Sequence, residues 1–201
     1  MDVTYDIVYK VILIGDSGVG KTATMERYLK GHFANEYSST IGIDFGVKIV
    51  NKDNRNIKLQ MWDTAGQDKF KSLISTYFRN VNVVLLVYSI KNMQSFINLK
   101  FWYEEFKSKA VGNEIIFVIG NKLDGSHTER IVSTEDGRHY AKRIGAEFFE
   151  VSAKADIHVD TLFESIIEKV DSSQSNMTDV NIGSNNNIIL KKEGANSKCC
   201  K

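Results

Sequence analysis

Eight residues between an apolar run and a helical pattern, from Gly15 to Thr22, have the spacing of a phosphate-binding loop. They read GDSGVGKT and fit the pattern G-x-x-x-x-G-K-[ST]. The glycines let the backbone curl so that successive N–H groups point at phosphate oxygens, and the following helix aims its N-terminal N–H groups at the same anion. Lys21 would place a charge on the outer phosphates, and the Thr22 hydroxyl would bind Mg²⁺. The alternative is a chance glycine-rich turn, which the position between a strand and a helix disfavours.

Two further stretches carry groups suited to a metal and a terminal phosphate. Asp63 and Gly66, in the stretch DTAGQ, end an expected strand. A carboxylate there can join a Mg²⁺ shell, and the Gly66 N–H can contact a γ-phosphate. Thr40 lies in a stretch without periodicity and could complete the metal shell. Taken singly, Asp63 also fits an ordinary turn residue and Thr40 an exposed loop threonine.

Two other stretches have the chemistry of a base-binding site. NKLD, from Asn121 to Asp124, follows an apolar strand pattern, and SAK, from Ser152 to Lys154, follows the last one. The Asp124 carboxylate can accept two hydrogen bonds, which matches the N1–H and N2–H₂ donors of guanine and leaves adenine unmatched. The Ala153 N–H could meet the guanine O6. Each match is weak alone, but their order at successive strand ends is not explained by chance.

The elements that must position these groups follow from hydrophobic periodicity. Strands are expected at 7–14, 43–49, 57–61, 83–87, 115–119 and 148–151, and helices at 21–30, 96–106, 133–145 and 159–170. The runs at 11–14, 83–87 and 115–119 are continuously apolar, as in strands buried on both faces of a parallel sheet. Alternation at 43–49 and 57–61, around a turn at 51–56, predicts a hairpin whose first strand buries Ile43, Phe45, Val47 and Ile49 on one face. Ser133 and Asp136 form a capping box, and Gly145 ends that helix. We therefore expect an α/β fold of the P-loop NTPase type, with a mostly parallel sheet of about six strands, one antiparallel edge strand and helices on both faces.

Composition limits the remaining choices. The chain has 201 residues, 42% of them hydrophobic and 25% charged, with a formal net charge of +1, so no nucleic-acid binding is expected. Residues 1–171 are expected to form one monomeric nucleotide-binding domain. The Asn- and Ser-rich residues 172–201 lack aromatic side chains and are expected to form a disordered tail. Neither a signal peptide nor a membrane-spanning segment is expected.

These motifs together resemble the Ras superfamily of small GTPases, and within it the Rab branch. The resemblance spans about residues 5–172 and rests on GDSGVGKT, STIGIDF, WDTAGQ, NKLD and EVSAK, with the Rab character carried by IGIDF, KLQMW and the twin cysteines. It implies that Phe33 stacks on the guanine base and that Tyr37 covers the phosphates. The implied metal ligands are Thr22, Thr40 and Asp63. The implied nucleotide ligands are Ser17, Gly18, Val19, Gly20, Lys21, Thr22, Ala23, Phe33, Tyr37, Thr40, Gly66, Asn121, Lys122, Asp124, Ser152, Ala153 and Lys154.

The resemblance also implies an activity, a GTP/GDP switch in vesicle trafficking that hydrolyses GTP slowly. Lys21 and Mg²⁺ would neutralise charge while Gln67 orients the attacking water, and an activating protein would accelerate the step. Loss of the γ-phosphate would release the segments of Thr40 and Gly66. One alternative is an ATP-using P-loop enzyme, against which Asp124 argues. Another is a GTP-binding scaffold with negligible turnover.

Further implied partners are an exchange factor, a dissociation inhibitor, a prenylation escort and effectors. Phe45, Trp62 and Tyr77 match the aromatic triad on which Rab effectors dock, beside Ile41 and Gly42, although ordinary core packing also explains three aromatics. Departures from the usual Rab pattern lie at Asp68-Lys69, Phe78, Asn80 and Ser89. They affect the assignment of a subgroup and not the chemistry.

The last residues, Cys199-Cys200-Lys201, do not form a C-a-a-X box. They resemble the twin-cysteine Rab ending, in which both thiols carry lipids, and two lipids are what stable anchoring requires. Free thiols or a metal site are the alternatives, but no other Cys or His is near. Ile188-Ile189-Leu190 is either a segment offered to the escort or a chance apolar triplet. The expected location is the cytoplasmic face of an intracellular or plasma membrane, in exchange with the cytosol.

Overall fold

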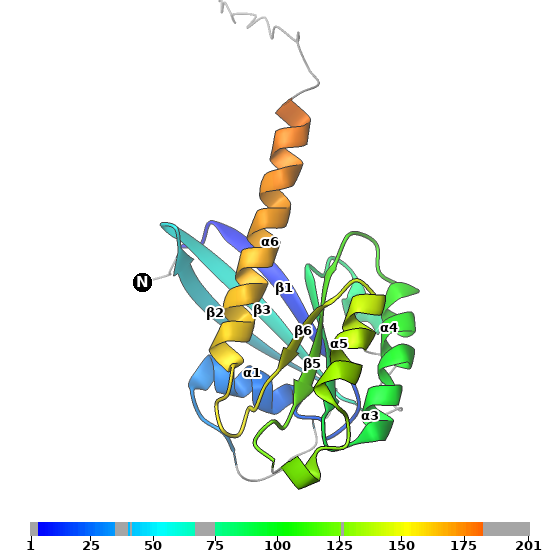
Figure 1. Ribbon diagram of the computed structural model, residues 1–201. Coiled ribbons are helices and arrows are strands. Elements are labelled where there is room, and N and C mark those ends of the chain that lie inside the picture. Colours follow the sequence, from blue (N-terminus) through cyan, green and yellow to red (C-terminus); the bar gives the residue numbers. More distant parts are fainter. Residues whose placement is uncertain (1–3, 35–39, 41, 67–74, 126, 183–201) are drawn as a thin grey trace, which may run out of the picture.

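A computed structural model describes residues 4–34, 40, 42–66, 75–125 and 127–182, with the backbone alone for Ser75, His127 and residues 174–182. The strands are β1 (Ile7–Ile14), β2 (Ile43–Lys52), β3 (Arg55–Thr64), β4 (Val83–Ser89), β5 (Ile115–Asn121) and β6 (Glu147–Glu150). The α-helices are α1 (Lys21–Lys30), α3 (Met93–Ile97), α4 (Leu99–Lys107), α5 (Thr134–Arg143) and α6 (Val159–Ile182) (Figure 1). Single 3₁₀ turns are η2 (Ser75–Phe78) and η3 (His127–Glu129). The predictions for Tyr37, Ile41, Gln67, residues 188–190, Cys199 and Cys200 lie outside the described residues.

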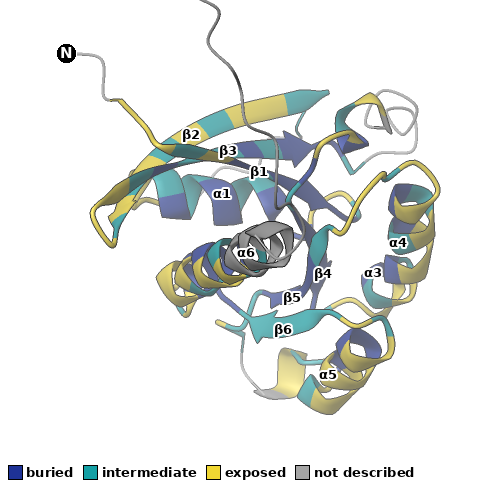
Figure 2. Ribbon diagram, turned by 90° about the horizontal axis from the view of Figure 1, so that it is seen from above, coloured by how far each residue is buried: buried dark blue, intermediate teal, exposed yellow. Residues whose placement is uncertain are grey.

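The strands form one sheet in the order β2-β3-β1-β4-β5-β6. β2 pairs antiparallel with β3 at one edge, and the other neighbouring pairs are parallel. Helices α1 and α6 cover one face, and α3, α4 and α5 cover the other (Figure 2). The predicted fold class is therefore confirmed.

Two hydrophobic cores, one on each face of the sheet, explain the continuous apolar runs. In β4, Val83, Leu85 and Val87 face α1 and α6, whereas Val84 and Leu86 face α4 and α5. All five side chains are fully buried. Because both faces of a central strand are covered, alternation is not required there, as predicted.

The prediction for the buried face of β2 is wrong. Phe45, Val47 and Ile49 are 46%, 40% and 36% exposed. Lys48 and Gly46 point inward over α1: the Lys48 ammonium lies 3.7 Å from the centre of the Tyr28 ring, and a Cβ on Gly46 would come within 2.3 Å of Leu29. A period of two separates the faces of a strand but does not say which one meets the core.

The hairpin turn is also tighter than predicted. β2 continues to Lys52 and β3 begins at Arg55, so that the turn consists of Asp53 and Asn54. Both residues have positive φ angles, 50° and 59°. Asp and Asn tolerate that conformation, and two such residues match the twist of a two-residue hairpin turn.

The helices agree with the predicted patterns, with one difference. The segment expected as one helix at 96–106 forms two helices, because the helix is interrupted at Asn98 between α3 and α4. In α5 the Ser133 side chain caps the helix by accepting from the Asp136 N–H, and Gly145 beyond its end has φ 69°, as predicted.

The apolar stripe of α6 is buried from Val159 to Val170, as its spacing predicts. The backbone stays helical to Ile182 and projects beyond the sheet (Figure 1). The domain boundary at residues 171/172 remains a prediction. Within the described ranges, no helix combines the length and the apolar character needed to cross a membrane.

Candidate functional site

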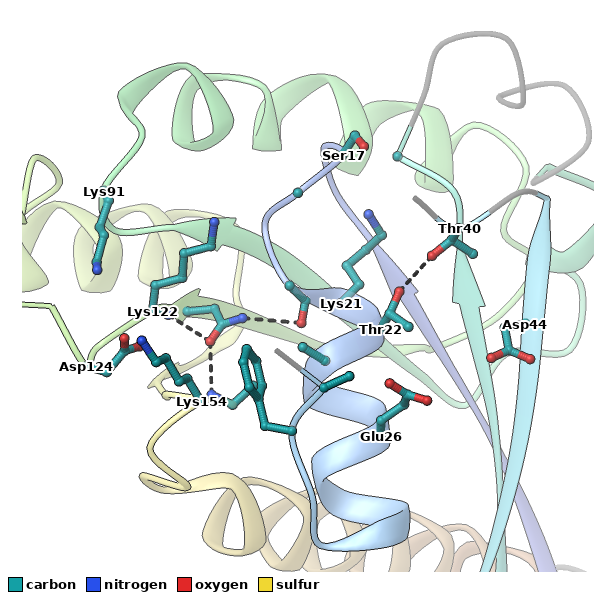
Figure 3. Close-up of a pocket in the computed structure, with 18 of the residues that line it drawn as sticks. Ser17, Lys21, Thr22, Glu26, Thr40, Asp44, Lys91, Lys122, Asp124 and Lys154 are labelled. Atoms are coloured by element: carbon teal, nitrogen blue, oxygen red, sulfur yellow. Dashed lines mark hydrogen bonds between the residues drawn. The ribbon is translucent and has the colours of Figure 1, made fainter. Parts of the chain in front are cut away.

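A cleft of about 630 Å³ opens at the carboxyl ends of the central strands (Figure 3). Most of the predicted nucleotide ligands line it: Ser17, Gly18, Gly20, Lys21, Thr22, Ala23, Phe33, Thr40, Gly66, Asn121, Lys122, Asp124, Ala153 and Lys154. Val19 and Ser152, which were also predicted, are buried behind this wall. Predicted ligands from six separate stretches of sequence are thus brought to one cavity.

The loop from Gly15 to Gly20 is shaped for close approach of an anion. Gly20 has φ 97°, and a Cβ there would lie 2.2 Å from the Asn121 Nδ2 atom. The helix α1 begins at the next residue, and its first turn contains no acidic residue. Its N-terminal N–H groups and the positive end of its dipole therefore face the cleft without competition from a side-chain carboxylate.

Lys21 is folded back onto this loop. It is 4% exposed, and its ammonium donates to the backbone oxygens of Gly15 and Asp16, both at 2.8 Å. Burial lowers the pKa of Lys21 to about 8, and the carboxylates of Asp63 and Asp16 oppose that shift. A phosphate in the cleft would favour the charged form further, since an anion close to an ammonium stabilises it.

Three oxygen-bearing side chains from three segments meet beside Lys21. The hydroxyls of Thr22 and Thr40 lie 2.7 Å apart, and both donate to the Asp63 Oδ2 atom. The other carboxylate oxygen of Asp63 is buried without a hydrogen-bond partner among the described residues. Burial raises the pKa of Asp63 to about 6, against the effects of the Thr22 hydrogen bond and the Lys21 charge. Hard oxygen ligands with an unsatisfied buried carboxylate oxygen fit Mg²⁺.

At the end of the cleft away from Asp63, Asn121 connects three loops, those of Val19, Lys122 and Ala153. It is 2% exposed, and its Nδ2 donates to the Val19 oxygen at 2.9 Å. Its Oδ1 accepts from the N–H groups of Lys122, at 2.7 Å, and Ala153, at 3.4 Å. The long bond to Ala153 leaves that N–H available to an oxygen in the cleft.

Asp124 lies at the rim of the cleft, at the same end as Asn121. Its Oδ1 accepts from the Ser152 hydroxyl at 2.7 Å, which orients the carboxylate. Burial would raise the pKa of Asp124, but the Ser152 hydrogen bond and the charges of Lys91 and Lys154 outweigh it and lower the pKa. The carboxylate is therefore ionised and can accept hydrogen bonds from the edge of a purine.

Comparison with known proteins decides which nucleotide this cleft serves. The Ras family model matches residues 10–172. Human Ras-related protein Rab-26 is 39% identical over 198 residues, covering 98% of this chain and 77% of its own. Human Ras-related protein Rab-3D is 41% identical over 169 residues, covering 84% of this chain and 77% of its own. The chain belongs to the Rab branch of the Ras family. As a Rab, it is a GTPase that binds GTP and GDP and acts as a switch in vesicle trafficking.

Several residues that support the site of this Rab GTPase have no motif to reveal them. Asp16 in the phosphate loop accepts from the Asn98 amide at 2.7 Å and from the Trp102 indole N–H at 2.8 Å. Arg27 of α1 donates to the backbone oxygens of Ala153 and Lys154. These bonds join segments more than 80 residues apart, so no local pattern in the sequence indicates them.

Three charged residues that line the cleft, Glu26, Asp44 and Lys91, were not predicted as part of the site. Glu26 and Asp44 lie near the threonines, whereas Lys91 lies near Asp124 (Figure 3). Lys91 comes two residues after β4 ends, at the edge where the other ligands gather. That position is the signal that could have indicated it.

The aromatic triad of this Rab forms a continuous cluster. The ring centres of Phe45 and Trp62 are 4.6 Å apart, and those of Trp62 and Tyr77 are 5.0 Å apart. Phe45 is half exposed, whereas Trp62 and Tyr77 also pack against the core on the face of α4. The sequence left two alternatives for these aromatics, core packing and an exposed docking surface. The cluster has features of both. Gly42, with φ 82°, lies where its backbone oxygen accepts from the Ala65 N–H.

Proposed function

We propose that GTP binds with its base against Asp124 and Ala153 and its phosphates in the loop from Gly15 to Thr22. Water then attacks the γ-phosphate, and the loss of that group is the signal. The observation that carries this proposal is the meeting of Thr22, Thr40 and Asp63 oxygens at one point. Thr40 itself lies outside the helices and strands, so a ligand that its hydroxyl contacts would control the position of this residue.

Catalysis in this scheme is mostly positioning and charge stabilisation. Lys21 neutralises the outer phosphates, and Gln67 orients the water. Thr22, Thr40 and Asp63 would hold Mg²⁺, which supplies charge stabilisation to the β- and γ-phosphates when bound. Gly66 is pressed against the phosphate loop: a Cβ there would lie 2.2 Å from the Ser17 nitrogen. This approach supports a role for its N–H at the γ-phosphate.

Single-turnover hydrolysis by the full chain tests the reaction. We expect slow phosphate release from GTP that excess ATP does not inhibit, and acceleration by a Rab-activating protein that supplies an arginine. Thr40→Ala should retain GDP but lose preference for GTP analogues, while Thr161→Ala, which alters an exposed threonine on α6, should match wild type. Tight GTP binding with no turnover even with an activator would instead favour the GTP-binding scaffold.

Membrane attachment is proposed to rest on lipids on Cys199 and Cys200. The twin-cysteine ending supports this, because two chains give stable anchoring where one gives marginal binding. Mass spectrometry of the chain from a eukaryotic host should show two isoprenoid additions. A tagged Cys199→Ser/Cys200→Ser variant should lose its membrane localisation, and an unmodified wild-type terminus would refute the proposal.

Effector binding is proposed at the cluster of Phe45, Trp62 and Tyr77. Support comes from the exposure of Phe45 on β2 and its continuity with Val47, which is also exposed. Phe45→Ala should reduce GTP-dependent binding of an effector without changing GTP binding. The exposed Val111, in the connection between α4 and β5, provides a matched apolar control as Val111→Ala.

A further inference from the structure

Lys91, Gly125 and Glu129 form a small assembly at the base end of the cleft. The Lys91 ammonium pairs with the Glu129 carboxylate at 2.6 Å. The lysine side chain is 29% exposed and the glutamate 55%. Lys91 lines the cleft and points toward Asp124 (Figure 3). The pair therefore lies against Gly125, the residue directly after Asp124.

Gly125 provides the space for this arrangement. A Cβ at this position would lie 2.4 Å from Lys91 Cε, 2.7 Å from Lys91 Nζ and 2.8 Å from Glu129 Oε2. Its φ angle is outside the left-handed region, so the backbone conformation itself does not demand glycine. The absence of a side chain instead lets the end of Lys91 pass over the backbone directly after Asp124.

The pairing leaves the Asp124 carboxylate available to a base. Within the described part of the chain, Lys91 donates to Glu129 and not to Asp124, so it acts on Asp124 through space. The Ser152 hydroxyl occupies one acceptor site of Asp124. A carboxylate has about four such sites, so two can still meet the donors of guanine. Glu129 thus keeps the cation close to Asp124 without letting it compete with the base.

We propose that Lys91, held by Glu129 over Gly125, is a positioning residue for the guanine base. Its charge attracts the Asp124 carboxylate without hydrogen-bonding to it, and its aliphatic stem excludes water from the exposed side of the Asp124–base contact. This inference rests on the proposed placement of guanine against Asp124. It deepens that proposal by adding a residue that governs how long the nucleotide stays and how strongly guanine is preferred.

The test measures release of GDP carrying a fluorescent ribose label from the full chain. Lys91→Met, Glu129→Gln and Gly125→Ala should each speed release by about three- to fivefold, as expected for a partly exposed ion pair. The three changes act differently, since they remove the cation, free it to compete for Asp124, or displace its end with a Cβ. Lys91→Arg keeps the charge and should restore slow release.

Lys100→Met is the matched control. It removes a lysine from an exposed pair with Glu104, 3.8 Å away on α4, and should leave release unchanged. Competition by inosine diphosphate, which lacks the 2-amino group that Asp124 would accept from, supplies the readout that general loosening would not move. Lys91→Met should lower the preference for GDP over inosine diphosphate.

The outcomes separate this inference from the proposed function. A wild-type chain that does not retain GDP would refute the placement of the base and this inference together. Wild-type retention with unchanged release from Lys91→Met would overturn the inference alone. Faster release from Lys91→Met with an unchanged GDP-to-inosine-diphosphate preference would also overturn it, because the effect would not pass through Asp124.

Discussion

Removing the Asn121 side chain should weaken nucleotide binding strongly, although this buried side chain serves mainly to hold neighbouring loops together. Asn121→Ala eliminates the bond to the Val19 oxygen at 2.9 Å and the bond from the Lys122 N–H at 2.7 Å. A typical hydrogen bond contributes about 1 kcal/mol, and a buried oxygen left unpaired costs about 1 kcal/mol more. The sum of about 2–3 kcal/mol corresponds to a loss of GDP affinity of about 30- to 150-fold. Weaker contacts of the same amide, at 3.3 Å to the Gly20 oxygen and 3.4 Å to the Thr24 hydroxyl, favour the upper end.

Equilibrium binding of labelled GDP, with urea unfolding of the same samples, measures this effect. Asn121→Asp keeps the size of the side chain but replaces the donor to Val19 with an acceptor, so it should bind GDP no better than Asn121→Ala. Asn51→Ala is the control, because it removes an exposed amide that bonds Asn56 at 2.9 Å on the hairpin. If the Asn121→Ala variant is folded and binds GDP within threefold of wild type, the view that this amide couples the phosphate loop to the loops of Lys122 and Ala153 would be refuted.

Three further predictions concern the switch, the base and the core. Gly66→Ala should keep GDP affinity but slow single-turnover GTP hydrolysis on the order of a hundredfold, because a Cβ would collide with the Asp16 and Ser17 backbone; hydrolysis at the wild-type rate would contradict this. Asp124→Asn should lose GDP affinity by roughly 10²–10⁴-fold and gain affinity for xanthosine diphosphate, since the amide donates where the carboxylate accepts; competition binding measures both. Leu162→Ala should lower the free energy of unfolding of the GDP-bound protein by about 2–5 kcal/mol in urea, because Leu162 is fully buried between α6 and the sheet; a loss below about 1 kcal/mol would place the site outside the core.

The fold could be predicted in outline because its signals are local. The apolar runs at 83–87 and 115–119 can be satisfied only by strands covered on both sides, and the stripe at 159–170 only by a helix with one buried face. Strands that alternate with helices then lead to a mostly parallel sheet. The break at Asn98 was missed because both sides of it keep a helical spacing of apolar residues.

Much of the candidate site could also be predicted from the sequence, for a related reason. The phosphate loop works through its own backbone, so its glycines and Lys21 must be adjacent in sequence. Asp124 and Asn121 likewise lie within one short stretch. Functional residues that are adjacent in sequence form a recognisable motif. The order of these motifs along the chain indicated that they lie at one edge of the sheet.

The amino-acid sequence by itself determined the fold class and predicted the phosphate loop and a guanine base, because these signals lie in short contiguous stretches. Only the tertiary structure decided which face of β2 is exposed, since α1 occupies the side where Gly46 and Lys48 fit. It also decided that Lys91 and Glu129 meet across Gly125 beside Asp124, 38 residues apart in sequence. Hydrogen bonds and ion pairs between distant segments depend on distances of a few ångströms, which periodicity and spacing along a chain do not encode.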